Sequence, residues 1–146
     1  IDAASVKPYS WLYLPHASQG PANRVTYMSN YSPRNAPAGR GSIQAEITHA
    51  GPLLVDRALL DGLRDALGRE TLLDPRSVTT VHHFSNEWAY ILFDKDFTRK
   101  RRLAIDGAER LGVIPLGRFG RFDYFNSDQC LVAARQTVDR LLARTR

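Results

Sequence analysis

The chain of 146 residues has one cysteine, Cys130, and lacks most of the motifs that tie a sequence to a cofactor. A single cysteine excludes an internal disulfide and a zinc site built on several cysteines, and it suits a reducing compartment. No apolar run approaches the roughly 18 residues of a membrane span. Neither G-x-G-x-x-G nor G-x-x-x-x-G-K-[ST] occurs, which excludes a glycine-rich phosphate-binding loop in this sequence. We therefore expect a cytoplasmic protein with no membrane partner.

The sequence also lacks internal repeats, low-complexity segments and a starting methionine. Its first five residues do not follow the basic-then-apolar order of a signal peptide. Apolar residues make up 43% and charged residues 24%, an ordinary globular composition that at this length predicts one domain. We expect residues 1–146 to form a single domain or a fragment of a longer protein.

The net charge of +5 is concentrated in one region. Residues 94–121 hold eight basic and four acidic side chains, including the run Arg99–Arg102. This run could contact phosphates, but a solvated helical turn is the more ordinary interpretation. No zinc-finger, homeodomain or RNP-type motif accompanies it, so we expect no nucleic-acid partner.

Hydrophobic patterning predicts five short strands: Trp11–Leu14, Arg24–Ser29, Ser42–Thr48, Ser77–Phe84 and Glu87–Phe93. In the third strand Ile43, Ala45 and Ile47 alternate with polar residues, which indicates one wet face and an antiparallel or edge position. Residues 30–41, rich in proline and glycine, predict a loop between the second and third strands.

Helical spacing of apolar residues predicts three helices. The first covers about Val55–Gly68, with Asp56 as N-cap and Gly68 as the left-handed residue after its end. The second covers Phe97–Leu111, with Leu103, Ala104, Ala108 and Leu111 facing inward and Gly112 closing it. The third begins at the capping-box pattern Asn126–Gln129 and carries an apolar stripe that includes Leu131 and Val138. The order of elements favours an α+β fold with a mainly antiparallel sheet packed with about three helices.

Few residues suggest chemistry by pattern alone. His82 and His83 are adjacent in a predicted strand and would point to opposite faces, so we expect no metal site. Cys130 falls in the first turn of a helix, where a small buried thiol is a more ordinary role than a nucleophile. The junction from Gly117 to Asp128 combines glycine, arginine and aromatics ahead of a helix start. It is either a simple cap or a site where free N–H groups receive an electron-rich ligand, and local sequence leaves both open.

Several motifs, in order, resemble the UDP-galactopyranose mutase family, especially its eukaryotic type. They are Trp11-Leu-Tyr-Leu-Pro15, Arg24-Val-Thr-Tyr-Met-Ser-Asn-Tyr-Ser-Pro33, Trp88-Ala-Tyr90, and Leu116-Gly-Arg-Phe-Gly120 followed by Tyr124, Asn126 and Asp128. The resemblance runs from Trp11 to the end of the chain. Trp88-Ala-Tyr90 departs from it, because both prolines of the family's Tyr-Pro-x-Pro segment are missing.

This resemblance implies the C-terminal, substrate-side portion of a two-domain flavoprotein in the mutase and amine-oxidase-like superfamily. FAD would be held mainly by a missing N-terminal domain, and we expect none on this chain alone. Residues 113–146 would return to that FAD-binding domain, with Gly117, Arg118, Asn126, Ser127 and Asp128 near the cofactor. A nucleotide-sugar substrate would meet Arg24 at its diphosphate and also Tyr13, Asn30, Tyr31 and Tyr90. The alternative is a non-enzymatic basic module that binds phosphorylated ligands through Arg99–Arg102, or a protein partner.

Overall fold

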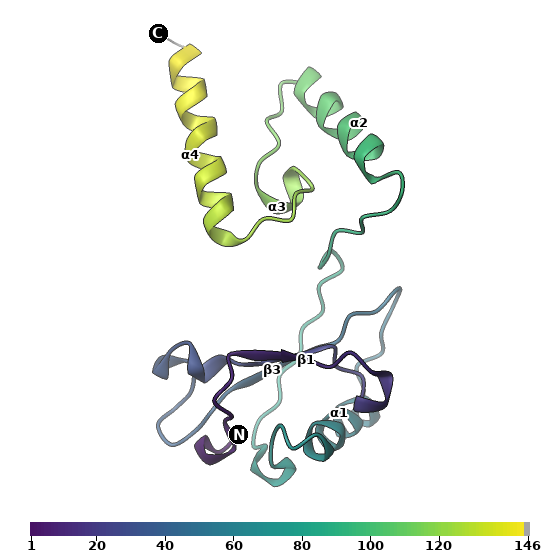
Figure 1. Cartoon of the computed structure of the whole chain (residues 1–146), viewed down its shortest axis with the longest axis vertical. Coiled ribbons are helices and arrows are strands. Elements are labelled where there is room, and N and C mark those ends of the chain that lie inside the picture. Colours follow the sequence, from purple (N-terminus) through teal and green to yellow (C-terminus); the bar gives the residue numbers. More distant parts are fainter. Residues whose placement is uncertain (145–146) are drawn as a thin grey trace. The chain divides into compact units, whose positions relative to one another are not determined.

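The computed structural model describes residues 1–144 and divides the chain into two compact units. The first unit is Ile1–Phe84, and the second begins at Ser85. In Figure 1 the first is coloured purple to teal and the second teal to yellow. Whether the chain is one domain or a fragment of a larger one stays a prediction.

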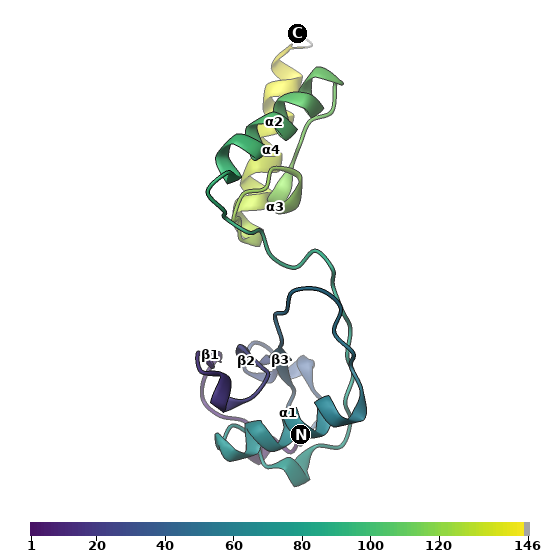
Figure 2. The same cartoon turned by 90° about the vertical axis from the view of Figure 1, so that its right-hand side faces the viewer.

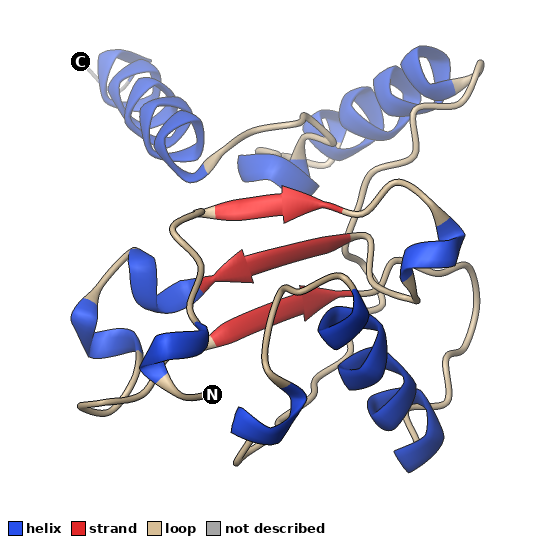
Figure 3. Cartoon of the chain, turned by 60° about the horizontal axis from the view of Figure 1, so that its bottom comes forward, coloured by secondary structure: helices blue, strands red, loops and turns tan. Residues whose placement is uncertain are grey.

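The first unit is built on a three-stranded antiparallel sheet in the order β1-β2-β3 (Figure 3). The strands are β1 (Trp11–Tyr13), β2 (Arg24–Tyr27) and β3 (Ile43–Glu46). The first three predicted strands are therefore confirmed in shortened form. Strand β2 ends at Tyr27, before the predicted end at Ser29, because Met28–Asn30 forms one turn of 3₁₀ helix.

Helix α1 (Arg57–Arg69) lies along one face of this sheet (Figure 2). It begins as predicted, because the carboxylate of Asp56 accepts a hydrogen bond from the N–H of Leu59 at 2.9 Å. Between helix and sheet lies a core of buried apolar side chains: Leu14, Ala22, Val25, Tyr27, Leu67, Leu72 and Leu73. Tyr27 is completely buried, and its hydroxyl donates to the carbonyl of Leu72 at 2.6 Å.

The end of α1 differs from the prediction for Gly68. This glycine lies inside the helix, which continues to Arg69, and Thr71 takes the left-handed conformation with φ 58°. Gly68 is required for a different reason: a Cβ there would lie 2.4 Å from Cγ of Pro75. The prediction of Gly68 as a left-handed helix cap is therefore wrong, and close packing against Pro75 is what a side chain at this position would disturb.

The two later strand predictions, Ser77–Phe84 and Glu87–Phe93, are wrong. Residues 78–96 contain neither helix nor strand. β-branched and aromatic residues favour a strand only when a neighbouring strand satisfies the backbone. The sheet offers these segments no partner, since its ladders join only β1 to β2 and β2 to β3 in the described chain.

The second unit is helical, with α2 (Phe97–Arg110), the four-residue α3 (Gly117–Gly120) and α4 (Ser127–Arg144). Gly112 follows α2 with φ 75°, as predicted. At the start of α4 the side-chain oxygen of Gln129 accepts from the N–H of Asn126 at 2.8 Å, which is one half of the predicted capping box. Helix α3 packs against α4 (Figure 1). Together with the sheet, these helices confirm the α+β fold class.

The predicted inward face of α2 is not buried. Leu103 and Leu111 are exposed, and α2 contains no buried residue. Helix α4 behaves similarly: Leu131 is 72% exposed, whereas the polar Thr137 is buried. Apolar periodicity marks the face that a helix tends to bury, but this unit does not supply the covering surface. Within residues 1–144, no helix is both long and apolar enough to cross a membrane.

Candidate functional site

The face of the sheet opposite the core carries polar and aromatic side chains in register. Tyr13 pairs with Arg24, and Arg24 pairs with Glu46, so these three residues form one row across the three strands. Because successive residues of a strand point to opposite faces, Trp11 lies on the same face as Tyr13. We call Trp11, Tyr13, Arg24 and Glu46 the sheet platform.

The central side chain of the platform is Arg24. Its Nη2 lies 2.5 Å and its Nε 3.0 Å from the same carboxylate oxygen of Glu46. The carbon at the centre of its guanidinium lies 6.0 Å from the centroid of the Tyr13 ring, within cation–π range. Arg24 and Glu46 are partly buried, whereas Trp11 and Tyr13 are half exposed or more. The platform thus combines a fixed cation with accessible aromatic surface.

Asn30 and Tyr31, also predicted to bind substrate, follow β2. The amide nitrogen of Asn30 donates to the carbonyls of Lys7 and Tyr9, at 2.7 Å each. This side chain therefore holds the segment that leads into β1. Tyr31 is 53% exposed and accessible to a ligand.

The second cluster surrounds Arg118 of α3. Its guanidinium lies 4.2 Å from the ring centroid of Tyr124, 5.8 Å from that of Tyr90 and 6.0 Å from that of Phe119. The Nε of Arg118 is buried without a hydrogen-bond partner among the described residues. We call Arg118, Tyr90, Phe119 and Tyr124 the arginine–aromatic cluster. It includes Arg118 from the predicted cofactor side and Tyr90 from the predicted substrate side.

A mostly apolar hollow of about 560 Å³ lies between the start of α3 and the first turns of α4. Its lining includes Gly117 and Ser127, both predicted to lie near the cofactor, together with Leu116, Cys130, Leu131 and Ala134. Gly117 has φ 75°, and a Cβ added to it would meet nothing within 4 Å, so the space beside it is open. Asn126 and Asp128, the remaining predicted cofactor residues, are exposed at the start of α4. An apolar hollow beside free helix N–H groups suits a flat aromatic ring with polar edges.

The basic run Arg99–Arg102 is paired with carboxylates. Arg99 lies near Asp96, Lys100 near Asp94, Arg101 near Asp123 and Arg102 near Asp106. The Lys100 contact, at 2.6 Å, holds the pKa of Asp94 below its usual range. This pairing favours the interpretation of the run as a solvated helical face over the phosphate-binding alternative.

No group of three or more histidine, cysteine or acidic side chains within residues 1–144 is placed to hold a metal ion. His82 and His83 lie in the irregular segment after α1 and are exposed. Cys130 is a free, half-buried thiol that lines the apolar hollow.

The comparisons with known proteins agree with the motif resemblance. A solved structure described as reduced UDP-galactopyranose mutase superposes on 91% of this chain with a TM-score of 0.78 and 25% sequence identity. The chain corresponds to 29% of that protein's length, so it spans less than a third of it. No family model and no curated protein matches the sequence.

Four residues of the sheet platform and the arginine–aromatic cluster were not predicted as site residues: Trp11, Glu46, Phe119 and Tyr124. Alternation with Ile43 and Ala45 assigns Glu46 to the polar face of its strand, but only the register of β2 and β3 shows that it lies opposite Arg24. Tyr124 was noted in a motif but given no role. Its stacking with Arg118 depends on the turn at Phe122, which has a φ of 49°. No local sequence pattern predicts this positive φ at a phenylalanine.

Proposed function

We propose that this chain is the substrate- and flavin-facing portion of a flavoenzyme similar to UDP-galactopyranose mutase, acting on a nucleotide sugar. The observation that carries the proposal is the superposition on that mutase over 91% of the chain at 25% identity. The superposition and the motif resemblance point to the same family. The whole protein would include an FAD-binding domain in the part of the mutase that this chain does not cover.

The sheet platform would bind the substrate. Arg24 would bring a guanidinium cation to the diphosphate, and its Nε and Nη2 contacts with Glu46 fix the orientation of that cation. Tyr13 and Trp11 offer aromatic faces next to it on the edge strand, where a sugar or base can pack. Asn30 supports this arrangement by fixing the chain ahead of β1, and Tyr31 adds an exposed phenol nearby in sequence.

The residues around the apolar hollow fit a flavin. Gly117 leaves open space, and Ser127 and Asp128 lie in the first turn of α4, where N–H groups have no intrahelical acceptor. Within the described part of the chain, the buried Nε of Arg118 has no hydrogen-bond partner. When bound, FAD would supply the redox and nucleophilic chemistry, which no acid–base pair in this chain replaces. Arg118 would place positive charge beside the electron-rich ring system, and Asn126 would contribute from the start of α4.

The test uses the full-length protein of which this chain would form part. We expect bound flavin after purification and turnover of UDP-galactopyranose after reduction of the protein. Arg24→Ala should weaken UDP binding by about 1.5–3 kcal/mol and leave the flavin content unchanged. Arg64→Ala, which removes a half-exposed arginine from α1, is the matched control and should change neither.

Absence of flavin from the full-length protein would overturn the proposal. Flavin binding with no effect of Arg24→Ala on UDP affinity would retain the flavoprotein class and remove the assignment of the platform to the diphosphate. The alternative of a phosphate-binding module through Arg99–Arg102 predicts instead that Arg102→Ala weakens binding.

A further inference from the structure

A second hollow, of about 570 Å³, lies on another face of α4. Arg121 and Phe125 line it from the segment after α3, and the helix contributes Ala133, Gln136, Thr137, Asp139 and Arg140. The apolar hollow described above uses Cys130 and Ala134 instead. Since adjacent helical residues are turned by about 100°, the two hollows belong to different faces. This one has no part in the proposed flavin or nucleotide-sugar site.

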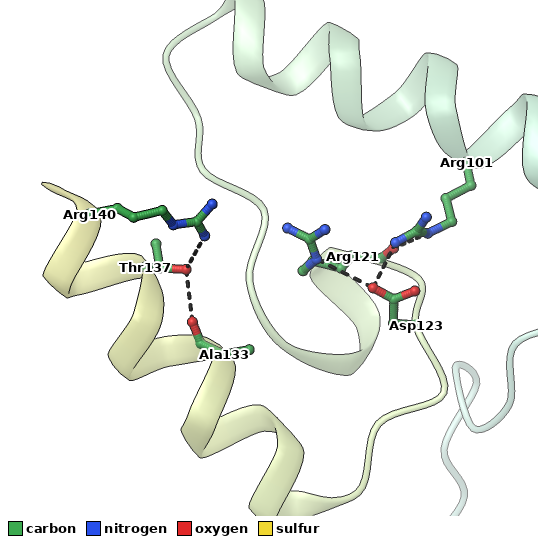
Figure 4. Close-up of polar contacts among 6 residues, drawn as sticks. All are labelled: Arg101, Arg121, Asp123, Ala133, Thr137 and Arg140. Atoms are coloured by element: carbon green, nitrogen blue, oxygen red, sulfur yellow. Dashed lines mark hydrogen bonds and ion pairs between the residues drawn. The ribbon is translucent and has the colours of Figure 1, made fainter.

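The first wall of the hollow has more positive than negative charge. Arg101 donates to Asp123 at 2.6 Å, and Nε of Arg121 lies 3.3 Å from the same carboxylate oxygen. Arg101 also donates to the backbone carbonyl of Arg121 at 2.7 Å, which fixes the turn (Figure 4). One carboxylate thus serves two guanidinium groups, and Arg121 keeps donors for a further acceptor.

The second wall carries Arg140, whose hydrogen bonds are to neutral acceptors. Its Nε donates to the carbonyl of Gln136 and its Nη2 to the hydroxyl of Thr137, both at 3.2 Å. Thr137 in turn donates to the carbonyl of Ala133 at 2.8 Å. Within residues 1–144, no carboxylate lies within ion-pair distance of Arg140. Figure 4 shows the guanidinium groups of Arg121 and Arg140 directed toward the same space.

The net charge of the side chains at this hollow indicates which class of ligand it would bind. The groups in and beside the hollow are Arg101, Arg121, Arg135 and Arg140 against Asp123 and Asp139, the last of which lies 4.0 Å from Arg135. Four positive and two negative charges leave an excess of two positive charges. A dianion that accepts several hydrogen bonds balances this excess, and a phosphoryl group is the common biological example.

We propose that this hollow binds a phosphoryl dianion between Arg121 and Arg140. Each guanidinium offers its remaining N–H groups to the phosphoryl oxygens, and the ring of Phe125 lines the hollow beside them. Arg140 is held by Gln136 and Thr137, so little side-chain freedom is lost on binding. Arg140 differs from the basic residues of the run Arg99–Arg102, each of which lies near a carboxylate, because its hydrogen bonds are to neutral acceptors.

The experiment titrates the 146-residue chain with inorganic phosphate and, separately, with pyrophosphate at constant ionic strength, by calorimetry and by NMR of the arginine Nε–H groups. We expect saturable binding at low millimolar concentration, with shifts at Arg121 and Arg140. Arg140→Gln should weaken binding by about tenfold, the loss of one charge-assisted bond. Arg140→Lys should recover only part of the affinity, because an ammonium group lacks the planar fork.

Arg102→Gln is the matched control, since it removes the same charge from the same unit at an exposed position on α2. Full affinity in Arg102→Gln together with loss in Arg140→Gln supports the site. Equal losses in both variants would show unspecific attraction to net charge and overturn it, as would the absence of saturable binding. Arg140 is exposed and outside the Arg101–Asp123 contact, so its replacement is not expected to impair folding. The proposed flavoenzyme function would be unaffected by either outcome.

Discussion

Arg24 and Glu46 face each other across β2 and β3, with Nη2 of the arginine 2.5 Å from Oε1 of the glutamate. Their side chains are 30% and 19% exposed, so the pair lies between a surface salt bridge and a buried one. The same guanidinium lies near the exposed ring of Tyr13. The pair therefore acts on both the stability of the sheet and the orientation of the proposed diphosphate-binding cation.

A double-mutant cycle on Arg24→Ala and Glu46→Ala should give a coupling energy of about 1–2 kcal/mol in the unfolding of the first unit. The reason is that partial burial reduces screening of this pair by water. The matched control is the pair Asp61 and Arg64 on α1, which is 3.3 Å apart and more than 40% exposed at each side chain. That pair should couple by less than about 0.5 kcal/mol. Equal coupling energies would contradict the role assigned to burial.

Because Tyr27 is buried, we expect the free energy of unfolding to fall at alkaline pH. Burial, aided by nearby Tyr9, raises the pKa of Tyr27 to about 12 from an ordinary value of 10.0. Because the folded state disfavours the phenolate, the stability from this residue is complete below pH 10 and is lost as the pH rises through 12. Urea unfolding across this range should show the decline in the wild type. In Tyr27→Phe the decline should be smaller, with a constant penalty of about 1 kcal/mol for the hydrogen bond to Leu72.

An equal decline in Tyr27→Phe would assign the alkaline loss to other groups. The hydrogen bond from Tyr27 to the carbonyl of Leu72 would then stabilise the fold without accounting for the pH dependence.

Arg118 and Gln129 separate the two interpretations of the junction before α4. Gln129→Ala removes the contact to the N–H of Asn126 and should destabilise the second unit by about 0.5–2 kcal/mol. Among the described residues the side chain of Asn126 accepts no hydrogen bond from the N–H of Gln129, so Asn126→Ala should have a smaller effect than Gln129→Ala. Arg118→Ala removes the stacking on Tyr124, which is worth about 0.5–1 kcal/mol at a partly exposed site. In the full-length protein, Arg118→Ala should also lower FAD occupancy or shift the reduction potential of the flavin.

Thermal unfolding of the chain and flavin absorbance of the full-length protein measure these effects separately. Full occupancy and an unchanged potential in Arg118→Ala would leave the junction as a helix cap alone.

Features that depend on residues close together in the sequence were predicted, whereas features that depend on pairing between distant segments were not. Asp56 and Gln129 were identified because a helix cap involves residues within four positions of one another. Asp56 accepts from the N–H of Leu59 and Gln129 from the N–H of Asn126, as expected. The strands predicted around Phe84 and Tyr90 were wrong, because a strand needs a partner that local patterning does not show. The platform was half predicted: the motif supplied Tyr13 and Arg24, whereas Glu46 required the register of β3.

The apolar faces of the helices in the second unit also show what local patterning does not predict. Leu131 and Leu103 have the spacing of buried residues, yet both are exposed in the second unit. Their periodicity is consistent with a covering surface in a larger protein, as expected of a chain that spans 29% of the superposed mutase. Sequence patterning reports which face is apolar, but it does not report which surface covers it.

Two glycines near α1 should respond to alanine in opposite directions. Gly62 lies inside the helix, and a Cβ there meets nothing within 4 Å, so Gly62→Ala should stabilise the first unit by about 0.5–1 kcal/mol through helix propensity. Gly20 has φ 116°, and a Cβ there would lie 2.4 Å from Cβ of Ala66 on the same helix. Gly20→Ala should therefore destabilise the unit by more than about 1 kcal/mol, because backbone strain and a steric clash act together. Urea unfolding of the two variants measures both effects against the wild type. A neutral Gly20→Ala would show that α1 can move away from residue 20 at no cost, and would contradict the close packing of this helix on the segment between β1 and β2.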